Sequence, residues 1–178
     1  MTEFELIKGC IRQDRSCQRL LFEQYAGKMM TVCLRYAHDT MEAEDMLQEA
    51  FIRVFNYIEQ FKFEGSFEGW VRRVVVNTAL KQLQKKRLNF SEISDNNQHA
   101  PRLESYAYSN LGEEELMKLI HQLPDGYKTI FNLNVIEGYS HEEIARMLDI
   151  QPSTSRSQLV KARKMLQQQI LNLQKIAV

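Results

Sequence analysis

The chain has 178 residues, of which 23 are Lys or Arg and 23 are Asp or Glu, so its formal net charge is zero. This length suits one or two small domains, and the balanced charge excludes a protein drawn to nucleic acid by its overall field. A site for a polyanion must therefore arise from local segregation of charge. Residues 72–87 carry six basic side chains and no acid, whereas residues 42–49 carry four acids and no base.

The rest of the composition favours an all-α protein, since Gly and Pro are few and few segments alternate between polar and apolar residues. Cys10, Cys17 and Cys33 are an odd number without a Cys-x-x-Cys pair, so neither a disulfide framework nor a zinc site is expected. No phosphate loop, nucleophile motif or histidine cluster is present, which predicts no catalysis, no cofactor and no metal. Without a signal sequence or a long apolar run, we expect a cytoplasmic protein with no membrane insertion.

Two helices are predicted at the start of the chain. Thr2 and Glu5 have the spacing of a capping box, which predicts a short first helix. Asp14 suits the N-cap of a longer helix that reaches Tyr36. Its apolar stripe predicts core positions at Leu21, Phe22, Tyr25, Met29, Val32, Cys33 and Tyr36.

Residues 40–60 predict a third helix with one apolar and one acidic side. The buried side is expected to hold Ala43, Leu47, Ala50, Val54 and Ile58. The opposite side is expected to show Glu42, Asp45, Gln48, Glu49, Ile52 and Arg53. It could be a solvated face or a set of metal-binding carboxylates, but no histidine shares the helix. Because Ile52 stands exposed among charges, we favour a surface that docks on another protein.

A loop with three Phe and two Gly occupies residues 61–69, and a fourth helix is predicted from Trp70 to about Leu88. Val71, Val74, Val75, Thr78 and Leu83 are its inward candidates. The other side holds Asn77 and the basic residues Arg72, Arg73, Lys81, Lys85, Lys86 and Arg87. Cations follow phosphates and aromatic rings stack on bases, so this side suits single-stranded nucleic acid. Trp70 could equally be a core residue.

Residues 89–112 are rich in Ser, Asn and acidic residues and show no sustained period, which predicts a linker. Beyond it, a helix is expected from Glu113 to Gln122. Another is expected from Pro124 and Asp125 towards Gly138.

The last 40 residues have the pattern of a helix-turn-helix. Ser140 and Glu143 form a possible capping box, residues 149–152 interrupt the helical pattern, and a second helix is predicted from Ser153 to about Leu173. No carboxylate occurs from Ile150 onward. On a helical wheel, Ser157, Lys161 and Lys164 lie opposite Leu159, with Arg156 beside them. These side chains form a face that suits binding in the major groove. A charged helical hairpin that binds nothing is the alternative.

The order of these segments resembles the extracytoplasmic-function sigma factors, small two-domain subunits that initiate transcription with bacterial RNA polymerase. Residues 43–51 resemble the family's polymerase-binding helix, and residues 67–87 its promoter-melting segment. Residues 123–166 resemble its C-terminal recognition domain. The resemblance implies an all-α fold with two small helical domains, 1–88 and 113–178, joined by a flexible linker at 89–112. The second domain would be a four-helix unit with the helix-turn-helix.

The resemblance also implies roles. Asp45, Gln48, Glu49 and Ile52 would dock on core RNA polymerase. The surface for the minus-ten element of promoter DNA would comprise Trp70, Arg72, Arg73, Asn77, Lys81, Lys85, Lys86 and Arg87. The major-groove surface for the minus-thirty-five element would comprise Ser153, Thr154, Arg156, Ser157, Val160, Lys161 and Lys164. An anti-sigma factor is a further implied partner.

The sequence departs from the family's pattern at two places, and two alternative functions are left open. Residues 153–155 read Ser-Thr-Ser where many relatives carry Gly-Thr-Val, and Gln158 replaces a basic residue, which affects the expected base preference. A repressor would use the helix-turn-helix alone, as a dimer on symmetric half-sites. A helical adaptor would bind no DNA, and its binding would respond little to salt.

Overall fold

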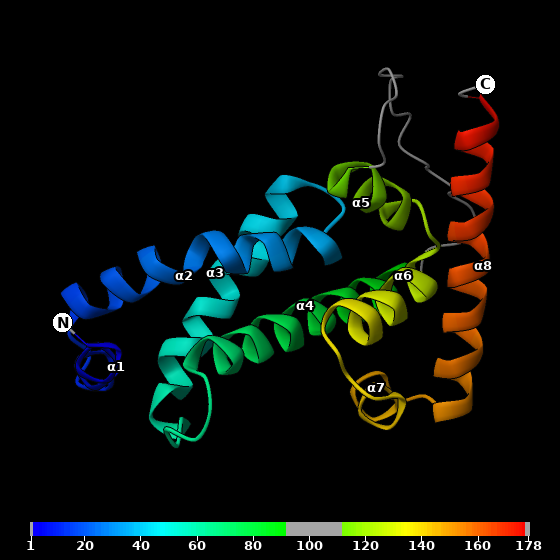
Figure 1. Ribbon diagram of the computed structural model, residues 1–178. Helices are drawn as coiled ribbons and strands as arrows, with labels where there is room; N and C mark the ends of the chain where they lie inside the picture. Colours follow the sequence, from blue (N-terminus) through cyan, green and yellow to red (C-terminus); the bar gives the residue numbers. More distant parts are fainter. Residues whose placement is uncertain (1, 92–111, 177–178) are drawn as a thin grey trace. The chain divides into compact units, whose positions relative to one another are not determined.

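The computed structural model describes residues 2–91 and 112–176, which form helices and turns without any strand within those ranges. The chain divides into two compact units, at the boundary between residues 94 and 95. Figure 1 shows the helices of each unit. These features confirm the predicted all-α, two-domain class, whereas most of the predicted linker, residues 92–111, lies outside the described residues.

In residues 2–91, the described part of the N-terminal unit, there are four helices and one short 3₁₀ turn. They are α1 (Glu3–Ile11), α2 (Arg15–Tyr36), α3 (Thr40–Tyr57), the 3₁₀ turn η1 (Ile58–Gln60) and α4 (Phe67–Ser91). Helices α2, α3 and α4 pack against one another, and α1 packs on α2 and η1. Leu21, Met29, Met46, Val54 and Val75 are among the side chains that fill this core.

Local hydrogen bonds explain where the first three helices begin. The backbone N–H of Glu5 donates to Thr2 Oγ1 at 3.2 Å, and the N–H of Thr2 donates to Glu5 Oε2 at 2.8 Å. Asp14 Oδ1 accepts from the N–H of Ser16 at 2.8 Å, and Asp39 caps α3 in the same manner. The caps predicted at Thr2 and Asp14 are therefore confirmed.

Helix α4 differs from its predicted bounds at both ends. It begins at Phe67 rather than Trp70, because Ser66 Oγ accepts from the N–H of Gly69 at 3.3 Å and the Phe67 ring is buried in the core. It continues to Ser91, three residues past the predicted end, through residues that include no Gly or Pro to stop it. Val71, Val75 and Thr78 face inward as predicted, whereas Val74 and Leu83 are only partly buried.

Over its described residues, 112–176, the C-terminal unit is a four-helix unit, as predicted. It comprises α5 (Glu113–His121), α6 (Asp125–Phe131), the π-helical turn η2 (Asn132–Ile136), α7 (His141–Leu148) and α8 (Pro152–Ile176). Leu119, Ile120 and Leu123 pack against Ala162 and Leu166 of α8, the stripe that the sequence predicts.

The π-helical turn was not predicted from the sequence. It ends at Ile136, two residues before Gly138, whose φ of 80° lies in the left-handed region that glycine adopts readily. Asn134 Nδ2 donates to the carbonyl of Tyr139 at 2.9 Å, and Asn132 is fully buried. These contacts fix the segment that leads into α7.

Candidate nucleic-acid interface

The outer face of α3 carries the predicted polymerase-binding residues. Ala43, Met46, Leu47, Ala50 and Val54 are buried. Asp45, Gln48, Glu49 and Ile52 are exposed, and Ile52 keeps 61% of its surface accessible. Glu49 Oε1 lies 2.6 Å from Arg53 Nη2, so the guanidinium neutralises part of the acidic face. The face therefore combines carboxylates, an amide and one large apolar side chain.

Glu42 does not belong to this face, although the sequence pattern placed it there. Its side chain is buried, and Oε2 accepts from the N–H of His38 at 2.9 Å. Its own N–H donates to Asp39 Oδ1 at 2.7 Å. Glu42 thus closes the first turn of α3, where a carboxylate is stabilised by the helix dipole.

Helix α4 presents polar residues along one side at four-residue spacing. Arg73, Asn77, Lys81 and Lys85 are exposed at that spacing, which places them on a broad common face. Arg72 is half-buried beside them. Lys86 and Arg87 belong to α4, but their side chains lie outside the described part.

Trp70 joins an aromatic cluster at the start of α4. Its ring stacks nearly parallel on Phe67, with centroids 5.7 Å apart, and lies 5.9 Å from Phe61. Trp70 is half-buried, so it serves partly as core and partly as surface.

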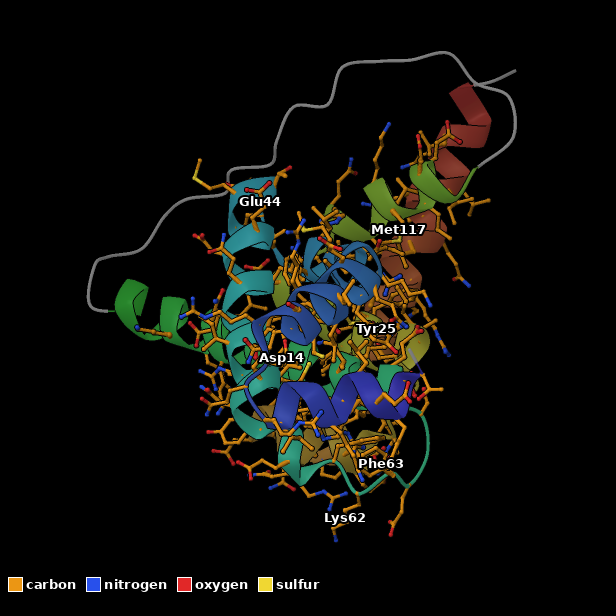
Figure 2. All side chains as sticks on the ribbon, turned by 90° about the vertical axis from the view of Figure 1, so that its left-hand side faces the viewer. Asp14, Tyr25, Glu44, Lys62, Phe63 and Met117 are labelled. Atoms are coloured by element: carbon orange, nitrogen blue, oxygen red, sulfur yellow. The ribbon has the colours of Figure 1, made fainter. Side chains whose placement is uncertain are left out.

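Phe63, in the loop before α4, is a candidate that the sequence analysis did not assign. It keeps 43% of its surface accessible and has a φ of 58°, a strained conformation for a bulky residue. Its ring centroid lies 5.1 Å from that of Phe61. The signal in the sequence that could have indicated it is the density of phenylalanines in the loop that leads into α4. Figure 2 shows Phe63 next to the exposed Lys62 on this loop.

Helices α7 and α8 form the helix-turn-helix. Ser140 Oγ accepts from the N–H of Glu143 at 3.2 Å, and Glu143 Oε2 accepts from the N–H of Ser140 at 2.9 Å, which confirms the predicted box. Asp149 adopts a left-handed φ of 54° and ends α7. Helix α8 then begins at Pro152, whose fixed φ suits a first helical turn.

The outer side of α8 carries most of the predicted major-groove residues. Ser153, Arg156, Ser157, Val160, Lys161 and Lys164 are exposed, and Thr154 is half-buried. Arg156 Nη1 lies 3.3 Å from Glu142 Oε1, so the neighbouring helix holds this guanidinium. Ser155, by contrast, is fully buried and its Oγ lies 2.8 Å from His141 Nδ1. Its hydroxyl fastens α7 to α8 and is not available to a phosphate.

The described residues include no group of three or more His, Cys, Asp or Glu placed to hold a metal ion. Cys10, Cys17 and Cys33 are buried free thiols. Burial raises the pKa of the Cys33 thiol to about 12 and, helped by Cys17 and Asp14, that of Cys10 to about 11. Between residues 2 and 91 and between residues 112 and 176, no helix has the length and hydropathy to cross a membrane.

Two family models match the chain, one in each unit. The model for sigma-70 region 2 matches residues 21–88. The model for sigma-70 region 4 matches residues 113–166. These two segments correspond to the helices that carry the faces described above.

Three curated relatives match along nearly their full length. The RNA polymerase sigma-H factor of Pseudomonas aeruginosa is 30% identical over 172 residues, which cover 90% of this chain and 89% of the relative. The ECF RNA polymerase sigma-E factor of Haemophilus influenzae is 29% identical over 182 residues, 96% of each chain. The ECF sigma factor SigW of Bacillus subtilis is 27% identical and covers 94% of this chain and 96% of its own.

Two solved structures share the fold at low sequence identity. The sigma factor RpoE of Bartonella quintana, crystallised with the anti-sigma factor NepR, aligns with a TM-score of 0.57 and 16% identity. The alignment covers 84% of this chain and 94% of that chain. CnrH, in complex with the cytosolic domain of CnrY, aligns with a TM-score of 0.50 and 14% identity, over 93% and 94% of the two chains. Both sigma-70 regions occur in order, and relatives align end to end. The chain therefore belongs to the extracytoplasmic-function family of RNA polymerase sigma factors.

Proposed function

We propose that this sigma factor uses three separate surfaces to direct transcription initiation. Residues 1–88 form a domain that binds core polymerase and the minus-ten element, residues 89–112 form a linker, and residues 113–178 form a domain that binds the minus-thirty-five element. The observation that carries the proposal is the exposure of one acidic face and two basic faces on different helices, each outside the core that its helix helps to form.

The acidic face of α3 is the proposed polymerase-binding surface, built from Asp45, Gln48, Glu49 and Ile52. An exposed apolar residue surrounded by polar groups is the usual composition of an interface centre and its rim. Burial of Ile52 on docking would remove apolar surface from water, and the carboxylates would orient the encounter with a basic partner.

The basic face of α4 is the proposed surface for the minus-ten element. Arg72, Arg73, Lys81 and Lys85, continued by Lys86 and Arg87, would neutralise phosphates. Trp70 and Asn77 would meet unpaired bases by stacking and hydrogen bonding. Extrusion of a base from a duplex costs a few kcal/mol, which such contacts must offset.

The outer face of α8 is the proposed reader of the minus-thirty-five element. Arg156, if bidentate to a guanine, would contribute about 1–3 kcal/mol of discrimination. Lys161 and Lys164 would contact phosphates, and Val160 can meet a thymine methyl group. Ser153, Thr154 and Ser157 supply hydroxyls for the backbone or for base edges.

The protein acts, in this proposal, without catalysis, cofactor or metal of its own, since bond formation belongs to the polymerase. Its partners are core RNA polymerase and promoter DNA, so it works in the cytoplasm. A relative with the same fold is solved with an anti-sigma factor, which supports a comparable inhibitory partner for this chain.

Capture of core polymerase tests the docking face. Gln48→Ala and Ile52→Ala should weaken binding to purified core polymerase at least fivefold with little change in thermal stability. Gln24→Ala on α2 is a matched control, because it removes another exposed helical glutamine. If Gln48→Ala and Ile52→Ala both bind core polymerase as the control does, α3 is not the docking face.

Salt dependence separates this proposal from its rivals. If about six phosphates are neutralised, affinity for promoter DNA should fall on the order of a thousandfold between roughly 50 and 200 mM salt. A helical adaptor would show little dependence on salt. A repressor would bind its duplex site tightly as a dimer without polymerase, whereas we expect promoter selection to require core polymerase.

A further inference from the structure

A continuous series of aromatic contacts joins α1 to the start of α4. The ring of Phe4, on α1, lies 5.1 Å from that of Phe63, which lies 5.1 Å from Phe61. Phe61 in turn contacts Trp70 and lies 5.1 Å from Phe67. Residues 61–66, here called the aromatic loop, are therefore held between α1 on one side and α4 on the other.

The aromatic loop needs support from outside itself. Phe63 has a φ of 58° and is followed by Gly65 with a φ of 84°, so the loop turns through backbone conformations that bulky residues rarely adopt. Such a conformation persists only where neighbouring contacts hold it. Apart from Phe61 within the loop, Phe4 is the aromatic ring that contacts Phe63 among the described residues.

Helix α1 is itself fixed to the body of the domain. The Tyr25 hydroxyl donates to Glu3 Oε2 at 2.6 Å, and the Tyr25 ring packs edge-on against Phe67 at 5.7 Å. Lys8 Nζ lies 4.3 Å above the centre of the Phe4 ring, an attractive cation–π arrangement that restrains Phe4. Phe4 thus transmits the position of α1 to the aromatic loop.

We propose that Phe4 is a positioning residue that holds Phe63 ready to stack on an unpaired base of the melted promoter. Phe63 keeps 43% of its surface accessible, the exposed Lys62 stands next to it, and Phe61 connects it to Trp70. Rings beside cations are the elements that bind single strands. The inference rests on the proposed minus-ten surface and extends it to α1.

The test uses holoenzyme assembled from core polymerase and each variant, with a fluorescent single-stranded oligonucleotide that carries the minus-ten sequence of a promoter mapped from this protein's own transcripts. The variants are Phe63→Ala, Phe4→Ala, Phe4→Tyr, the double variant Phe4→Ala/Phe63→Ala, and Leu20→Ala, together with Lys81→Ala and Lys85→Ala on the proposed minus-ten surface. Leu20 is a control because it is a similarly exposed apolar residue, on α2.

We expect Phe63→Ala to weaken oligonucleotide binding at least fivefold, the smallest loss that one stacked base implies. Phe4→Ala should weaken it about threefold or more while core binding stays unchanged. Phe4→Tyr should restore binding, and Leu20→Ala should bind normally. Since Phe4 acts through Phe63, the double variant should be no weaker than Phe63→Ala alone, a result that a general loss of stability would not produce.

Two outcomes would overturn the inference and leave the proposed function standing. In the first, Phe4→Ala binds the oligonucleotide as Leu20→Ala does, whereas Phe63→Ala and Lys81→Ala bind it weakly. In the second, the losses at Phe4 and Phe63 add fully in the double variant. If Lys81→Ala and Lys85→Ala bind the oligonucleotide as Leu20→Ala does, the proposed minus-ten surface itself is wrong.

Discussion

The guanidinium of Arg156, on α8, lies 3.3 Å from the carboxylate of Glu142, on α7. Both side chains are more than half exposed, at 54% and 63%, and an ion pair in such a position contributes only about 0–1 kcal/mol. On the proposed major-groove surface, a guanine would offer Arg156 about 1–3 kcal/mol of discrimination, enough for DNA to displace the carboxylate. Glu142 would then both hold Arg156 in place and compete with DNA for it.

Removal of that carboxylate should strengthen DNA binding. Glu142→Gln is expected to raise affinity for a minus-thirty-five duplex about two- to fivefold, since competition and repulsion of phosphates both disappear. The measurement is fluorescence anisotropy at fixed ionic strength, with Glu114→Gln on α5 as the control. In an Arg156→Ala background the gain should shrink. An unchanged or weaker affinity of Glu142→Gln would show that Glu142 does not compete for Arg156.

A pair of glycines tests the packing of α1 on α2. A Cβ added at Gly9 would overlap Cys17 Sγ and lie 2.8 Å from Cys17 Cβ, whereas nothing lies within 4 Å of a Cβ added at Gly27. Gly9→Ala should lower the free energy of unfolding by about 1–3 kcal/mol through overpacking. Gly27→Ala, exposed within α2, should raise it by about 0.5–1 kcal/mol. Urea denaturation measures both, and equal effects would contradict the packing of α1 on α2 in the structure.

Two serines of α8 should differ in what they contribute to stability. Ser155→Ala removes the buried contact with His141 and should cost about 1 kcal/mol of unfolding free energy. Ser157→Ala, on the exposed face, should change that free energy by less than about 0.5 kcal/mol. Thermal unfolding of the two variants provides the comparison. The interpretation fails if Ser157→Ala is the more destabilising of the two.

The buried thiols should resist alkylation in the folded protein. Thiolates are the reactive species, and the raised pKa values of Cys10 and Cys33, about 11 and 12, keep both thiols protonated near pH 8. In the unfolded chain they ionise near pH 8.5. The contribution of the two protonated thiols to the free energy of unfolding should therefore be fully present below about pH 8.5. It should fall as the pH rises towards 11–12. Mass spectrometry after iodoacetamide treatment should show labelling of these two residues only with denaturant; rapid labelling of the native protein would contradict their burial.

Features that depend on neighbours in sequence could be predicted. The capping boxes at Thr2 and Ser140 and the cap at Asp14 involve residues two or three positions apart, so the pattern contains all the partners. The stripe of α8 could be found for the same reason, since its period follows from helix geometry.

Features that depend on the folded conformation, rather than on a pattern in the sequence, could not be predicted. Glu42 has the spacing of a surface carboxylate, and only its bonds to His38 and Asp39 in the folded turn show why it is buried. Ser155 pairs with a histidine fourteen residues away. Phe4 and Phe63 lie far apart in sequence, so no periodic pattern indicates that α1 supports the aromatic loop.

Transcription by core polymerase with this protein, on fragmented DNA from its own source, tests the central claim most directly, with transcript ends mapped by sequencing. The account predicts starts that appear only when the protein is added and that share two sequence blocks, near minus ten and minus thirty-five. Starts should be lost with Gln48→Ala/Ile52→Ala and redistributed with Arg156→Ala. Transcript ends identical to those of core polymerase alone would contradict the account.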